Sequence, residues 1–239
     1  MPALIDRFLV LSHVAAGALA LLIAPVAMLT LKGGAWHRRA GAAYFWGMAW
    51  IFCSTIGLAF FRFNPFLFVI NILSFYAALM GYRVLYQKQP TKPGQQPGWI
   101  DWLASGVAAV GGVAFVLWGA AGLLGLRLGS MIFGDSAYQI IGIIFGALLA
   151  LQAFADMRRY RNPAAPADSQ WWRFEHIGRF GSAYIATVTA FLVQNGLRMR
   201  LVPAEWFWLL WVLPAMIGSV LISRAVRAQR AKFARKVAL

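Results

Sequence analysis

Long apolar runs separated by short polar breaks make up almost the whole chain. The runs cover residues 8–30, 41–61, 65–82, 100–126, 136–157, 176–196 and 205–223. A helix needs about 20 apolar residues to cross the hydrocarbon core of a bilayer, and each run comes close to that length. The breaks are rich in Gly, Pro and charge, and none could form a separate domain. The pattern predicts an all-α fold, a polytopic membrane bundle of seven transmembrane helices forming a single domain over residues 1–239.

The composition supports this prediction and excludes a soluble globular enzyme. Hydrophobic residues make up 61% of the 239 residues and charged residues only 12%, and the mean hydropathy is +0.67. A soluble domain is about one quarter charged. The single cysteine, Cys53, excludes an intrachain disulfide and a cysteine-based metal cluster. No basic leader precedes the first apolar run, so we expect an uncleaved first span.

The cations divide unequally between the two ends of the predicted bundle. Of 22 Lys and Arg, 17 fall at residues 32–39, 83–92, 158–179 and 224–236, in alternate breaks and in the tail. The other end holds Arg7, Arg62, Arg127, Arg198 and Arg200. Lys and Arg favour the cytoplasmic side of a membrane, so we expect the N-terminus outside and the C-terminus inside a bacterial inner membrane. The basic cytoplasmic tail, residues 224–239, is expected to meet anionic lipids. No soluble domain is left to bind nucleic acid.

Two pairs of similar segments indicate an internal repeat. RAGAAY at residues 39–44 recurs as RFGSAY at residues 179–184, an offset of 140. GALALLIAPVAM at residues 17–28 resembles GALLALQAFADM at residues 146–157, an offset of 129. We therefore expect two parallel three-helix repeats, residues 7–86 and 135–223, joined by a linker helix at 99–127. In transporters built from such repeats, ligands bind at the repeat interface.

The repeated segments place the same residue types at the start of two helices. Unpaired N–H groups and the positive end of the helix dipole, reinforced by Arg, favour an anionic ligand there. The small residues Gly41 and Gly181 would let neighbouring helices approach. The alternative is that these side chains only anchor the helices among lipid headgroups. The candidate ligand-binding residues are His37, Arg39, Tyr44, His176, Arg179 and Tyr184.

His13 is a further candidate, since a histidine inside a span is a functional candidate by default. It lies six residues beyond Arg7, near the end opposite His37. A structural role, with the ring bonded to a backbone carbonyl or a serine, is equally open. Asp156 is expected to form an ion pair with Arg158 or Arg159 at the helix boundary.

The first quarter of the chain resembles a known family. The resemblance rests on His13 followed by Gly17, on Lys32, and on HRRAGAAY opening the second span. It points to the predicted bacterial membrane proteins grouped as domain of unknown function 2306. It implies a multi-pass membrane protein and supplies no activity and no catalytic residues.

Three functions are compatible with these features. The first is a small transporter or ligand-binding protein for an anionic or headgroup-like ligand. The second is a redox protein in which His37 and His176 ligate a b-type haem, with Arg38, Arg39 or Arg179 meeting the propionates. The third is an accessory or scaffold subunit that packs on a membrane partner or on a second copy. An enzyme is less expected, and a zinc hydrolase least, because the chain has no HExxH motif.

Overall fold

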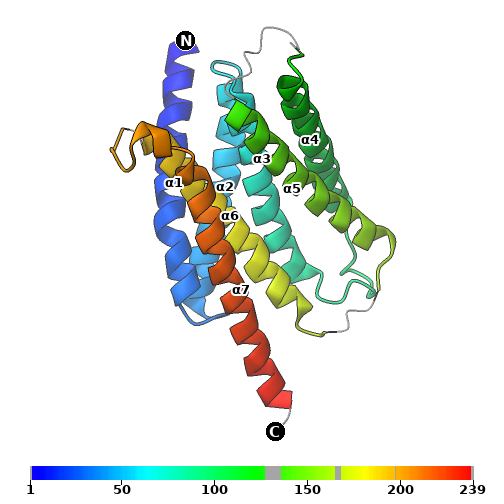
Figure 1. Ribbon diagram of the computed structural model, residues 1–239. Helices are drawn as coiled ribbons and strands as arrows, with labels where there is room; N and C mark the ends of the chain where they lie inside the picture. The colour runs from blue at the N-terminus through cyan, green and yellow to red at the C-terminus, as the bar shows by residue number, and fades with distance from the viewer. Residues whose placement is uncertain (1, 127–135, 165–167, 197, 238–239) are drawn as a thin grey trace.

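The computed structural model describes residues 2–126, 136–164, 168–196 and 198–237, and these residues form an all-helical protein without strands (Figure 1). The predicted boundaries at residues 127 and 135, Arg127 and the last two residues of the tail lie outside the described residues. Seven long helices run alternately up and down. They are α1 (Pro2–Leu29), α2 (Ala35–Ala59), α3 (Pro65–Arg83), α4 (Trp99–Leu123), α5 (Ser136–Arg161), α6 (Trp171–Asn195) and α7 (Leu209–Val237), with short 3-10 helices at Val84–Tyr86 and Ala204–Trp206.

Six of the described helices are long and apolar enough to cross a membrane, and α6 is the exception. The helix predicted at 176–196 is present, but it carries Arg173, Glu175, His176 and Arg179 in its first turns. The helix packs against α1, α3 and α7. Its polar side chains therefore face other helices rather than lipid, which is where charged groups in a membrane protein are tolerated.

Four helices form a ring. α1 packs against α2, α2 against α3, α3 against α6, and α6 against α1. α2 and α6 consequently lie on the diagonal of this ring, and side chains connect them across its centre. A hydrophobic cluster with members from all four helices fills the centre, and most of its buried members are small: Ala20, Ala24, Tyr44, Met48, Ala77, Ala78 and Ala183.

α4 and α5 form a hairpin beside the ring, where both pack against α3. Gly112 and Gly146 allow their backbones to touch, because a Cβ on Gly112 would lie 2.7 Å from the Gly146 carbonyl oxygen. Small residues at such crossings allow the close van der Waals packing that holds helices together in lipid.

We call the end that carries the loops at 30–34, 87–98 and 162–170 the basic end. α2 and α6 both begin there, with the same polarity (Figure 1). α1 packs along α2, whereas its expected counterpart α5 packs along α4. The two halves thus share helix direction but differ in pairing, and the internal repeat stays a prediction from the sequence.

The segment from residue 224 continues α7 as one helix that extends beyond the other helices (Figure 1). Arg230 and Phe233 of this segment contact the first turn of α6. The Arg230 guanidinium lies 4.9 Å from the centre of the Phe174 ring, and the Arg173 guanidinium 4.9 Å from that of Phe233. These cation–π contacts join the middle of the tail to the bundle.

Candidate two-histidine site

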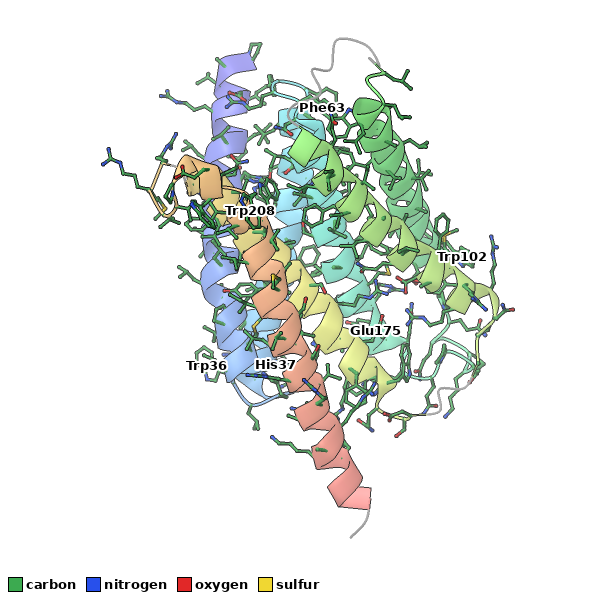
Figure 2. All side chains as sticks on the ribbon, viewed as in Figure 1. Trp36, His37, Phe63, Trp102, Glu175 and Trp208 are labelled. Carbon is green, nitrogen blue, oxygen red and sulfur yellow. The ribbon has the colours of Figure 1, made fainter. Side chains whose placement is uncertain are left out.

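His37 and His176 meet across the diagonal of the four-helix ring, at the basic end. Their ring centres are 6.2 Å apart and the ring planes are inclined by 66°. Figure 2 shows His37 at the lower end of α2. His37 lies three residues into α2 and His176 six residues into α6. Thus two of the candidate residues, 139 positions apart in the sequence, lie edge to face.

The Nδ1 atom of each histidine is bonded to a backbone carbonyl. The His37 Nδ1 lies 2.8 Å from the Ala27 oxygen on α1, and the His176 Nδ1 lies 2.9 Å from the Gly81 oxygen on α3. A carbonyl oxygen can only accept, so both Nδ1 atoms carry the hydrogen and donate it. In the neutral rings the lone pair is therefore on Nε2, the nitrogen that remains for a ligand or a metal.

A glycine makes this arrangement of His176 possible. At Gly81 a Cβ would lie 2.7 Å from the Phe180 ring and 2.9 Å from the Arg179 Cβ. α6 can therefore approach α3 closely only because residue 81 has no side chain. The same approach brings the Gly81 carbonyl within hydrogen-bond distance of His176.

Aromatic rings continue from the histidines into the bundle. The centre of the Phe180 ring lies 4.8 Å from that of His176 and 5.9 Å from that of Tyr44. The ring centres of Tyr44 and Tyr184 are 6.5 Å apart. The Tyr44 hydroxyl is 3.3 Å from the Thr187 hydroxyl, and the Tyr184 hydroxyl donates to the Leu21 carbonyl at 3.3 Å. The two candidate tyrosines therefore lie together in the centre of the ring, with their hydroxyls bonded to protein groups.

The two candidate arginines do not lie in equivalent surroundings. Arg39 is exposed. Arg179 is 11% exposed and donates to Asp156 at 2.7 Å and to Glu175 at 2.8 Å. Its remaining nitrogen lies 3.3 Å from the Gln152 side-chain oxygen. Two carboxylates thus already neutralise Arg179, and the pair of free guanidinium groups expected from the repeat is not formed.

Asp156 is the centre of a buried polar network that joins α3, α4, α5 and α6. The side chain is 2% exposed and accepts from the Tyr76 hydroxyl at 2.5 Å, from Arg159 at 3.0 Å and from Arg179. The Tyr76 hydroxyl also lies 3.0 Å from the Ser105 hydroxyl. The expected boundary ion pair of Asp156 is therefore present with Arg159, while Arg158 is exposed.

Three features were not expected from the sequence: Tyr76, Ser105 and a second ion pair, between the partly exposed Arg83 and the buried Asp101. Arg83 donates to both Asp101 oxygens, at 2.9 and 2.8 Å, and Asp101 is fully buried. The signal in the sequence was the charge of Asp101, one of only seven acidic residues in the chain, which lies inside an apolar run. A carboxylate within an apolar run is costly unless it is paired.

His13 is bonded to a serine, one of the two structural roles expected for it. Its Nδ1 lies 3.0 Å from the Ser54 Oγ on α2. Because the Ser54 hydroxyl donates to the Ile51 carbonyl at 3.0 Å, His13 is the donor in this bond. His13 ties α1 to α2 and takes no part in the two-histidine site.

Gly41 and Gly181 were expected to let neighbouring helices approach closely, and only Gly181 does so. A Cβ on Gly181 would lie 2.6 Å from Ile222, so Gly181 allows α7 to approach α6. Gly41 has no neighbour within 4 Å of such a Cβ. Close approach at this level therefore depends on α6 rather than on α2.

Within the described part of the chain, no group of three or more His, Cys, Asp or Glu gathers around a common point. The two histidines would thus supply two ligands to a metal, and a cofactor would have to bring the others.

Comparisons with protein families, with curated proteins and with solved structures give no match. The family resemblance of the first two spans therefore stays a prediction, and the functional argument depends on the geometry of the two-histidine site.

Proposed function

We propose that this membrane protein is a redox protein that binds one b-type haem between His37 and His176. The observation that supports it is the separation of 6.2 Å between the two ring centres. A metal–imidazole bond is about 2 Å long and the nitrogen lies about 1 Å from the ring centre, so two histidines that hold one metal between them would have ring centres about 6 Å apart.

The hydrogen bonds of the two rings support the same proposal. Metal-binding histidines usually donate their second ring nitrogen to a carbonyl or carboxylate, which fixes the ring and makes it a better ligand. His37 and His176 both do so, through Ala27 and Gly81. A porphyrin supplies four nitrogens of its own, which suits a site where the protein offers only two ligands.

The surroundings of the histidines are apolar toward the bundle and basic toward its end. Ala24, Ala77 and Ala78 are small residues of α1 and α3 that belong to the cluster filling the ring. Lys32, Arg38 and Arg39 lie in the loop and first turn beside His37, where cations would meet propionates. Bis-histidine haem supplies reversible one-electron transfer. His37 and His176 would bind it through Nε2, and their bonds to the Ala27 and Gly81 carbonyls would orient the two rings.

The basic end is proposed to face the cytoplasm of a bacterium. This assignment is supported by the excess of Lys and Arg in the loops at that end. Electrons would then be exchanged with the haem at the inner surface of the membrane.

The test is an absorption spectrum of the full-length protein, purified from cells supplied with a haem precursor and also after addition of haemin. We expect a Soret band, reduced α and β bands, and one haem per chain. His37→Ala and His176→Ala should each abolish or broaden these bands. His13→Ala is the matched control, since it removes the third histidine of the chain at the opposite end, and it should keep the spectrum. A folded wild-type protein without a Soret band would overturn the proposal.

An anionic-ligand or transport function is the second candidate, and the exposed Arg39 favours it. It is the weaker candidate because Arg179 is already paired with Asp156 and Glu175. Titration of the purified protein with inorganic phosphate tests it. Binding that is lost in Arg39→Gln and kept in Arg198→Gln would support this function over haem binding.

A further inference from the structure

We propose that α5 carries a specific binding site for one anionic phospholipid on the outer surface of the bundle, at the basic end. This site is separate from the two-histidine site and does not depend on the proposed haem. It lies where a cavity, a pair of unpaired cations and an apolar stripe coincide.

The cavity is an open depression in the surface of α5, with a volume of about 370 Å³, and is lined by Phe154, Met157, Arg158, Arg161 and Asn162. These five residues come from the last two turns of α5 and the residue after it. The lining combines two apolar side chains with two guanidinium groups and one amide. A phosphodiester above acyl chains matches that combination.

Arg158 and Arg161 differ from the arginine between them. Arg159 is turned inward, where it lies 3.0 Å from Asp156 and 3.7 Å from Glu175. Arg158 and Arg161 are exposed and form no ion pair with a described acidic residue. They are three positions apart and therefore neighbours on one helix face. Two adjacent free guanidinium groups are suited to hydrogen-bond the oxygens of one phosphate.

An exposed apolar stripe runs along α5 from the cavity. Leu148 is 45% exposed, Leu151 67% and Phe154 50%, at helical spacings of three residues. One leaflet of the hydrocarbon core is about 15 Å thick, which corresponds to about ten helical residues. An acyl chain of a lipid whose phosphate lies on Arg158 and Arg161 would therefore cover this stripe as far as Leu148.

The experiment is native mass spectrometry of the detergent-purified full-length protein with added phosphatidylglycerol, phosphatidylcholine or inorganic phosphate. We expect one phosphatidylglycerol to be retained at energies that remove phosphatidylcholine, and no retention of phosphate. Arg158→Gln with Arg161→Gln should weaken phosphatidylglycerol retention about tenfold or more. Phe154→Ala, a change on the lipid-facing surface, should weaken it several-fold through lost acyl contact.

Arg224→Gln with Arg227→Gln is the matched control, because it removes the same charge at the same end of the protein, away from the cavity. Retention in this variant should change less than twofold. Equal loss in both double variants would mean that charge alone attracts the lipid, and it would overturn the site. Equal retention of phosphatidylcholine, or binding of free phosphate, would overturn it as well. Thermal unfolding of each variant in the same detergent shows whether the fold is kept.

Discussion

The backbones of Gly112 and Gly146 are in direct contact where α4 crosses α5. A Cβ on either residue would lie 2.7 Å from the carbonyl oxygen of the other. Since the obstacle is backbone, a side chain at either position forces the helices apart. We expect Gly112→Val and Gly146→Val to lower the free energy of unfolding by about 1–3 kcal/mol. The shift is measurable as a lower unfolding temperature in detergent.

Gly106→Val on α4 is the control for this prediction. It adds the same atoms to the same helix at a glycine with no neighbour within 4 Å. It should leave the unfolding temperature nearly unchanged. If all three variants unfold alike, helix propensity rather than the α4–α5 contact sets the loss.

The second prediction concerns the buried carboxylate of Asp156. Asp156→Asn keeps the size of the side chain but leaves Arg179, which is 11% exposed, with one anionic partner fewer. Removing one member of a buried ion pair costs about 3–5 kcal/mol. We expect a loss of that size in denaturant or thermal unfolding, and less than about 1 kcal/mol for the exposed Asp168→Asn.

A double-mutant cycle separates the network from a general effect of lost charge. Arg179→Gln on the Asp156→Asn background should cost less than Arg179→Gln alone, because the partner is already neutral. Additive losses would show that the two side chains do not stabilise each other, in spite of the 2.7 Å contact between them.

The sequence was sufficient to predict the helices, but it was insufficient to predict the different roles of Arg39 and Arg179. Apolar runs predict the seven helices, since a membrane protein must place apolar side chains against lipid. Arg39 and Arg179 look alike in RAGAAY and RFGSAY. At the 129-residue offset, however, Asp156 on α5 corresponds to Ala27 on α1. Asp156 can therefore form an ion pair with Arg179, whereas the corresponding Ala27 is uncharged and cannot pair with Arg39.

The sequence also could not predict which helices pack against each other. Parallel repeats predict that α2 and α6 begin at one end, but not that α3 and α1 lie between them. Only the packing shows that the imidazoles of His37 and His176 lie edge to face in the middle of the four-helix ring. Their one-residue difference in register within the repeat gave no sign of this contact, because rotation of α6 around its axis decides where a side chain points.

The third prediction tests how Gly81 positions His176. In Gly81→Ala the new Cβ would lie 2.7 Å from Phe180 and 2.9 Å from the Arg179 Cβ, so α6 must shift away from α3. The His176 Nδ1 then loses its bond to the Gly81 carbonyl. If the two-histidine site binds haem, we expect weaker haemin retention and a broadened Soret band, together with a lower unfolding temperature.

Gly178→Ala is the control, since it lies on α6 between His176 and Arg179 and has no neighbour within 4 Å. It should retain haemin as the wild-type protein does. A Gly81→Ala protein that unfolds earlier and yet keeps an unchanged spectrum would show that the carbonyl bond to His176 does not support ligation.

The last prediction concerns orientation in the membrane. On a Cys53→Ala background, Thr91→Cys places a thiol in the loop at the basic end and Met199→Cys places one in the loop at the opposite end; both positions are exposed. The excess of Lys and Arg at the basic end favours its retention in the cytoplasm. In intact bacterial spheroplasts a membrane-impermeant maleimide should therefore label residue 199 and spare residue 91 until the membrane is opened by detergent. The reverse labelling would place the two-histidine site at the outer surface, where any electron donor or acceptor would have to be extracellular.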